Sequence, residues 1–182
     1  ADNIGSLFSA QNISKYLKYK KINIPTQTVI NYLRALTNAY FIHKVSRAEI
    51  NGLKIFEIGE KYYFEDLGIR NSVRGLNYRS DIGKLIENVV YMQLLRSGWN
   101  VYTGKDEERE IDFVGEKNGE HIYIQVCYLL ADEKTIQREF GNLMLIKDNY
   151  PKYVVTMDPL SHQNTYKGIH QLHLRDFLTM NI

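Results

Sequence analysis

A glutamate within an apolar helical segment is the first residue of this sequence whose setting implies chemistry. Residues 81–97 predict a long helix, and Glu87 shares one of its apolar stripes with Val90, Tyr91 and Leu94. A carboxylate in such surroundings needs a hydrogen-bond partner, a cation or a raised pKa. We therefore expect Glu87 to be paired with a polar group from another element.

A predicted β-hairpin supplies the other candidates. Asn118-Gly119 is a preferred two-residue turn, and it places Asp112 opposite Gln125 and Glu110 opposite Cys127. Because side chains alternate along a strand, we expect Asp112 and Gln125 on one face of the sheet. The opposite face is expected to be apolar and to carry Ile111, Phe113, Ile124 and Val126.

The elements that must position these residues follow the order α-β-β-β-α-β-(β/α). Polar loops are expected at residues 104–109 and 158–168. The expected elements are a helix at 81–97, strands at 99–103, 110–114 and 121–130, a helix at 133–149, strands at 153–157 and 169–174, and a helical turn at 175–180.

The first 75 residues predict a smaller module of a different kind. Helices at 9–21 and 26–40 precede two β-like runs, 41–50 and 54–64, which flank the turn Asn51-Gly52. This order is that of a winged helix, and a weakly patterned connector at 66–80 carries the boundary between the modules.

A winged helix binds either nucleic acid or protein, and the sequence leaves both open. The second helix is not strongly basic, which favours protein contact. The residues that would contact nucleic acid are Thr26, Gln27, Thr28, Asn31, Arg34, Lys44 and Arg47.

Charge and composition distinguish the two parts. Residues 1–75 carry 11 Lys and Arg against 6 Asp and Glu, whereas residues 76–182 carry 12 against 15. This difference suggests two modules with different partners, although a basic excess of this size is also common without selectivity. One cysteine, no apolar run of membrane-spanning length and no signal-peptide pattern predict a cytoplasmic protein without membrane contact. The missing initiator Met fits a fragment or a processed chain.

The order of a helix with Glu87, a strand with Asp112 and a strand with Gln125-Val126-Cys127 resembles the PD-(D/E)XK nuclease superfamily. Enzymes of that superfamily hold Mg²⁺ with carboxylates and use a lysine of the third motif to activate water. The resemblance places Gln125 at the second carboxylate and Cys127 at the lysine. Mg²⁺ prefers charged oxygens and a thiol suits softer metals, so only Glu87 and Asp112 remain as magnesium ligands. Lysines that could have replaced the missing one are Lys105, Lys134 and Lys147.

Six further stretches carry a resemblance: Ser6-Leu-Phe-Ser-Ala, Thr28-Val-Ile-Asn-Tyr-Leu, Lys61-Tyr-Tyr-Phe-Glu-Asp-Leu-Gly, Leu85-Ile-Glu-Asn, Arg109-Glu-Ile-Asp-Phe-Val and Asp148-Asn-Tyr-Pro-Lys-Tyr. They resemble one known family, the C-terminal domain of unknown function of predicted AAA-type ATPases from bacteria and archaea. This resemblance implies that an ATPase domain comes first in the whole protein. The chain itself has no G-x-x-x-x-G-K-[ST] loop, so ATP is expected only on that domain.

Together these observations predict an α/β (α+β) chain. A winged-helix-like module at residues 1–75 precedes a restriction-endonuclease-like mixed sheet, flanked by helices, at residues 76–182. The expected function is that of an interaction or regulatory region, with an inactive nuclease-like core, that contacts the ATPase domain and a protein partner. The alternative is a module that binds DNA and keeps a residual metal-dependent nuclease activity.

Overall fold

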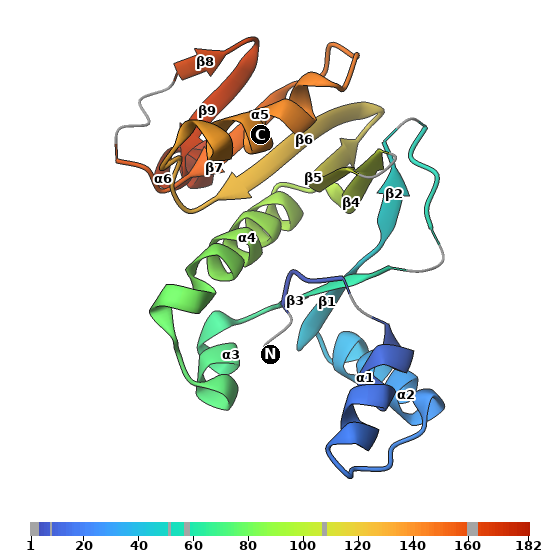
Figure 1. Cartoon of the computed structure of the whole chain (residues 1–182). Coiled ribbons are helices and arrows are strands. Elements are labelled where there is room, and N and C mark those ends of the chain that lie inside the picture. Colours follow the sequence, from blue (N-terminus) through green and yellow to red (C-terminus); the bar gives the residue numbers. More distant parts are fainter. Residues whose placement is uncertain (1–3, 8, 51, 57–58, 107–108, 160–163) are drawn as a thin grey trace.

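Helices cover both faces of one large β-sheet, and a smaller group of helices and strands packs beside it (Figure 1). The computed structural model describes residues 4–7, 9–50, 52–56, 59–106, 109–159 and 164–182. The expected fold class, a mixed α/β chain, is confirmed.

The large sheet is mixed in strand direction. Its second to fourth strands are mutually antiparallel, and the two strands after them continue parallel to the fourth. The first strand runs parallel to its neighbour, and the last runs antiparallel to its neighbour. Within the described residues it contains seven strands, in the order β2 (Arg47–Glu49), β4 (Asn100–Asp106), β5 (Arg109–Lys117), β6 (Glu120–Cys127), β7 (Lys152–Thr156), β9 (Ile169–His173) and β8 (Asn164–Tyr166).

Two clusters of buried side chains hold helices to the two faces of this sheet. On one face, α4 (Tyr78–Arg96) and α6 (Leu174–Thr179) pack on Phe113 and Ile124. On the other face, α5 (Glu133–Met144) packs on Tyr123. Among the described helices, none has the length and apolar composition that crossing a lipid bilayer requires.

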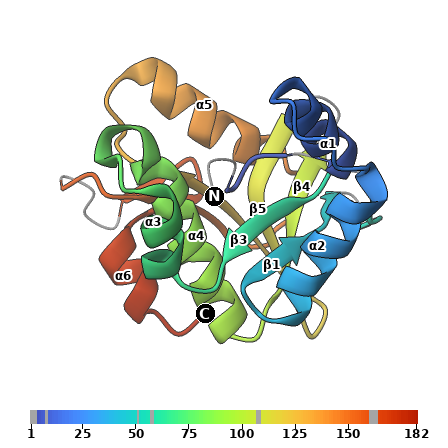
Figure 2. The ribbon, with the colours of Figure 1, turned by 90° about the horizontal axis from the view of Figure 1, so that it is seen from below.

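The first part of the chain packs against α4. Its two strands, β1 (Ile42–Val45) and β3 (Lys61–Phe64), pair antiparallel and lie between two groups of helices (Figure 2). The β1 and β3 side chains join the same buried cluster as α4. On one side of the pair are α1 (Ala10–Tyr19) and α2 (Thr26–Asn38), and on the other are α3 (Leu67–Arg74) and α4.

The boundary expected near residue 75 falls in the short link between α3 and α4. β2, which precedes this point, pairs with β4, which follows it. The two parts of the chain therefore share one sheet and one buried cluster.

Three expectations about irregular segments are wrong. The expected connector at 66–80 contains α3, because Asp66 caps its first turn by accepting from the backbone N of Ile69 at 2.9 Å. β4 extends to residue 106, into the expected loop at 104–109; residues 107–108 of that loop lie outside the described part. The expected loop at 158–168 contains β8, because a turn at Lys167-Gly168 with positive φ folds it onto β9.

The hairpin at Asn118-Gly119 has the expected register. Both turn residues have positive φ, and the strands pair from Lys117–Glu120 to Phe113–Ile124. Between Ile111 and Val114, however, β5 has one residue more than β4, which makes a β-bulge. Ile111 therefore packs on the α5 face while Phe113 packs on the α4 face, so the expectation that they share a face is wrong.

The hairpin at Asn51-Gly52 begins with the expected register and then departs from it. Ala48 lies opposite Ile55, as a two-residue turn requires, although Asn51 itself is outside the described part. Further along, Val45 pairs with Lys61, so the second strand carries three additional residues. The expected strand at 54–64 is therefore reduced to β3, which is the strand that reaches the candidate site.

Candidate functional site

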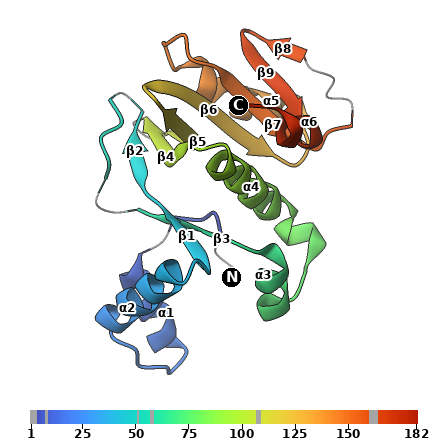
Figure 3. The same ribbon diagram turned by 180° about the vertical axis from the view of Figure 1, so that it is seen from behind.

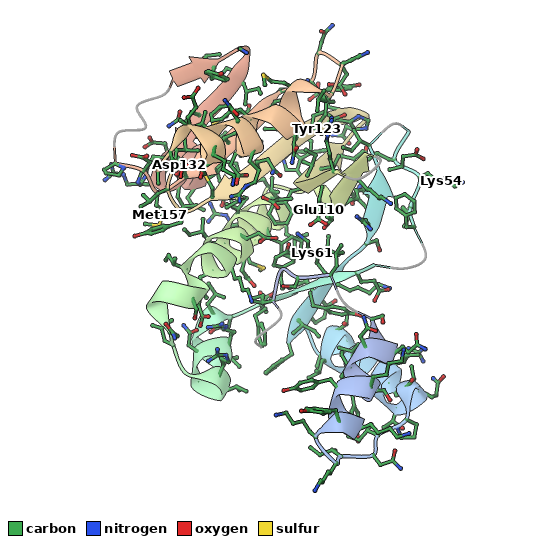
Figure 4. All side chains as sticks on the ribbon, in the orientation of Figure 1. Lys54, Lys61, Glu110, Tyr123, Asp132 and Met157 are labelled. Atoms are coloured by element: carbon green, nitrogen blue, oxygen red, sulfur yellow. The ribbon has the colours of Figure 1, made fainter. Side chains whose placement is uncertain are left out.

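A buried lysine lies among the carboxylates of the expected site. The Nζ atom of Lys61, on β3, is 2.8 Å from Oε1 of Glu110, 3.1 Å from Oε1 of Glu87 and 3.9 Å from Oδ1 of Asp112. Only 4% of the lysine side chain is exposed. Figure 4 shows Lys61 and Glu110 side by side, between β3 and the large sheet. The first part of the chain thus supplies the cation for carboxylates of the second part.

Charge keeps this lysine protonated. Burial by itself would lower the pKa of Lys61, because a desolvated ammonium is unfavourable. The surrounding charges of Glu87, Asp112 and Glu110 reverse that effect and raise its pKa above the usual value. We refer to Lys61, Glu87, Glu110 and Asp112 together as the lysine–carboxylate cluster.

Glu87 has the polar partners that its apolar helix predicts. Besides Lys61, the hydroxyl of Tyr63 donates to Glu87 Oε1 at 2.6 Å. The backbone at Gly5 passes close to the same carboxylate, and a Cβ atom built there would lie 2.9 Å from Glu87 Oε2. The expectation that Glu87 is paired is confirmed, and the N-terminal segment covers it.

Asp112 and Gln125 meet where the regular ladder between β5 and β6 ends. Gln125 Oε1 accepts from the backbone N of Asp112 at 2.7 Å, and Asp112 Oδ2 accepts from the backbone N of Val126 at 2.9 Å. Their side chains therefore continue the pairing that the backbone no longer makes. Burial and the neighbouring charge of Glu87 raise the pKa of Asp112 to about 8, against the opposing effect of Lys61.

Glu110 is not opposite Cys127, so this part of the expected register is wrong. The ladder stops at Phe113–Ile124, and the bulge in β5 turns Glu110 toward Lys61. Cys127 instead lies beside Thr156 of β7 and is buried. Burial raises the pKa of its thiol to about 12, which keeps it protonated and unsuited to bind metal as a thiolate.

A further carboxylate, Glu139 on α5, which the sequence analysis overlooked, meets Gln125. Gln125 Nε2 donates to Glu139 Oε2 at 3.2 Å, and Arg138 Nε donates to Glu139 Oε1 at 2.8 Å. The sequence does indicate a buried carboxylate at this position, because Glu139 lies in the apolar stripe of α5 with Ile136 and Leu143. Glu87 lies in an apolar stripe of α4 in the same way.

Lys61 and Tyr63 were also overlooked, and here the local signal is weak. A lysine at the start of a short apolar strand gives no indication of which carboxylate it will meet. The lysines proposed from sequence proximity lie elsewhere: Lys105 is 5.7 Å from the ring centre of Phe56, and Lys134 and Lys147 are exposed. Among the described ion pairs, none joins those three lysines to the lysine–carboxylate cluster.

The residues of the cluster do not fit a bound Mg²⁺ ion. Mg²⁺ requires near-octahedral oxygen ligands at about 2.0–2.1 Å. Here the Lys61 ammonium already contacts the oxygens of Glu87 and Glu110 that would face the ion. Within the described residues, no three His, Cys, Asp or Glu side chains form a group that could hold a metal ion.

The seven residues expected to contact nucleic acid fall into two groups. Gln27, Asn31 and Arg34 are exposed on α2, while Thr26 and Thr28 are half-buried there. Lys44 and Arg47 are directed toward carboxylates: Lys44 Nζ lies 2.5 Å from Glu60 Oε1, and Arg47 Nη2 lies 3.9 Å from Glu110 Oε2. A groove of about 530 Å³ between α1, α2 and the β1–β3 pair is lined by Thr26, Arg34 and Lys44 among others.

Comparison with known proteins gives a family domain and two relatives. Residues 1–80 match the family model named Domain of unknown function (DUF8612), which agrees with the expected domain of unknown function. An uncharacterized protein of Haemophilus influenzae is 33% identical over 181 residues, covering 98% of this chain and 43% of the relative. An uncharacterized protein of Methanocaldococcus jannaschii is 27% identical over 135 residues, covering 72% of this chain and 29% of the relative. The chain thus spans less than half the length of both relatives, and no solved structure matches it.

Proposed function

We propose that this chain is an interaction or regulatory region of a larger AAA-type ATPase, built on a nuclease-like core that does not cleave nucleic acid. The observation that carries the proposal is the position of the Lys61 ammonium. It occupies the space between Glu87 and Glu110. A nuclease of the PD-(D/E)XK superfamily, which this chain resembles, would hold its metal ion there.

The other polar groups of the site are also engaged. Tyr63 donates to Glu87, and Gln125 bonds both Asp112 and Glu139. Cys127, in the place of the usual lysine, is a protonated thiol and offers no positive charge to an attacking water. A set of groups that satisfy one another supports a structural role for the core.

The size of the relatives supports a place in a longer protein. Both are more than twice as long as the segment that matches this chain, so they have room for a further domain. The chain has no phosphate-binding loop, and in this proposal ATP binds to the ATPase domain alone. This region would contact that domain and a further partner. Its single cysteine can form no disulfide within the chain, which supports a reducing cytoplasm.

The test is a nuclease assay on the purified chain. Labelled single- and double-stranded DNA and RNA are incubated with Mg²⁺ or Mn²⁺, and the fragments are resolved on a denaturing gel. We expect no cleavage above that of an Asp112→Ala variant. Metal-dependent cleavage that disappears in Asp112→Ala would show an active nuclease and overturn the proposal.

A further inference from the structure

The α1–α2 pair is basic and carries no acidic residue. Residues 4–48 contain five lysines and two arginines but neither Asp nor Glu. Four of the lysines are exposed on α1 or just after it: Lys15, Lys18, Lys20 and Lys21. This stretch accounts for the basic excess of the first part of the chain.

Exposed tyrosine rings lie among these lysines. Tyr16 is 60% exposed and Tyr19 is 80% exposed, and α1 buries none of its residues. The Nζ atom of Lys20 lies 5.8 Å from the ring centre of Tyr16 and 6.0 Å from that of Tyr19, so the three side chains share one face. We call the surface formed by Lys15, Tyr16, Lys18, Tyr19, Lys20 and Lys21 the lysine–tyrosine surface.

The lysine–tyrosine surface lies at the end of the molecule away from the large sheet (Figures 1 and 3). Lysines near the C-terminus of a helix also offset its dipole, and that alone could explain their position. The dipole does not explain two large rings left in water beside them. A ligand that needs both positive charge and flat apolar rings accounts for all six residues.

We infer that the lysine–tyrosine surface binds single-stranded nucleic acid. Lysines contact successive phosphates, and unpaired bases stack on the rings of Tyr16 and Tyr19, the combination used by proteins that bind single strands without sequence preference. In a duplex the bases are stacked on one another, so the rings would find no partner. The inference rests on the proposed interaction role, for which it names the class of partner.

Fluorescence anisotropy with the intact chain tests this inference. The probes are labelled oligo(dT) and oligo(rU) of about 15 nucleotides, a matched duplex, and polyglutamate, without divalent metal and over a range of salt concentrations. We expect both single strands to bind more tightly than the duplex. The DNA and RNA arms show which strand is preferred.

Three variants separate charge from stacking. Substitution of Lys18, Lys20 and Lys21 by Gln should lower the slope of log K against log salt by about 2, because each phosphate contact contributes about 0.7. Tyr16→Ala with Tyr19→Ala should weaken binding about ten-fold or more without changing that slope. The matched control is Tyr166→Ala with Lys167→Gln, a similar pair at 5.5 Å on the β8–β9 turn, which should bind as the unmodified chain does.

Several outcomes would overturn the inference. The first is that neither single strand binds at low salt, and the second is that the control variant loses as much affinity as the tyrosine variant. The third is tighter binding of duplex that the tyrosine substitutions do not change. The fourth is equally tight binding of polyglutamate that the tyrosine substitutions weaken to the same extent. After the binding measurement, Mg²⁺ is added to the same samples, and the oligonucleotides are resolved on a denaturing gel. Cleaved strands would contradict the proposed inactive core, whereas intact but unbound strands would contradict only the lysine–tyrosine surface.

Discussion

The Nζ atom of Lys61 lies 2.8 Å from Oε1 of Glu110, and this ion pair joins two separate β-sheets. Lys61 belongs to the β1–β3 pair and Glu110 to the seven-stranded sheet. The pair therefore contributes directly to how the first part of the chain is held on the second. Lys61 is buried and Glu110 is one-third exposed, so the loss of one partner leaves charge that water solvates only in part.

Lys61→Met should destabilise the chain strongly at neutral pH. It removes the cation and leaves the charges of Glu87 and Glu110 uncompensated, so we expect a loss of about 3–5 kcal/mol in the free energy of unfolding. Urea denaturation followed by circular dichroism measures it. The control is Lys44→Met, which breaks a more exposed pair between Lys44 of β1 and Glu60, the residue before β3, and should cost about 1 kcal/mol or less. Equal losses in the two variants would contradict a special role for Lys61.

Removal of the Lys61 side chain should also let Glu87, Glu110 and Asp112, whose described positions form no metal-binding group, close around a divalent cation. In Lys61→Ala the oxygens of Glu87, Glu110 and Asp112 lose their ammonium, and Mn²⁺ can take its place. We expect saturating Mn²⁺ to raise the thermal midpoint of this variant by several degrees, equivalent to about 1–3 kcal/mol of binding linkage. The unmodified chain should not respond, and adding Asp112→Asn to the variant should abolish the effect. An equal shift in the unmodified chain would show that the lysine does not exclude the metal.

Protonation of Asp112 should make stability depend on pH. Its pKa is raised to about 8 by burial and by Glu87, so the folded chain holds a proton that the unfolded chain releases near pH 4. The stabilising effect is complete below the unfolded value and is lost as the pH rises through the folded value. Lys61, whose pKa is also raised, stays charged throughout this window.

The corresponding variant is Asp112→Asn, which mimics the neutral acid and keeps an oxygen for the backbone N of Val126. Between about pH 5 and pH 9, the unmodified chain should lose about 1–3 kcal/mol more than this variant does. Urea denaturation at a series of pH values gives the two curves. Parallel curves would mean that Asp112 is ionised over this whole pH range, so that folding does not raise its pKa.

Local sequence signals account for much of the fold and for part of the site. The turn Asn118-Gly119 predicts the register of its hairpin, and Glu87 in an apolar stripe predicts a polar partner in the protein interior. Both could be predicted because each signal lies within a single hairpin or helix. The bulge in β5 is different: it is defined against β4, a neighbour that sequence alone does not align. Ile111 and Glu110 were misplaced for that reason.

The identity of the cation is the clearest example of information that is not local. Lys61 is 26 residues from Glu87 and 49 from Glu110, and its approach depends on how β3 is offset against β1. Three additional residues in the second strand of that hairpin set the offset, and nothing in their composition indicates it. Proximity in sequence favoured Lys105, Lys134 and Lys147 instead. By contrast, a polar partner for Glu139 could have been predicted in the same way as for Glu87, since both residues interrupt an apolar helical stripe.

Gly5 should tolerate no side chain, because of both its backbone and its neighbour. Its φ of +69° disfavours any residue with a Cβ atom, and that atom would meet Glu87 Oε2 at 2.9 Å. A flexible carboxylate could normally move aside, but Lys61 and Tyr63 hold this one in place. Gly119, in the Asn118-Gly119 turn, has a φ of +84° with nothing within 4 Å, so Gly119→Ala isolates the backbone effect. We expect Gly119→Ala to cost about 1 kcal/mol and Gly5→Ala about 2–3 kcal/mol by urea denaturation. Combining Gly5→Ala with Glu87→Ala should give a loss smaller than the sum of the single losses, since the collision is gone. Additive losses would mean that the N-terminal segment does not rest on Glu87.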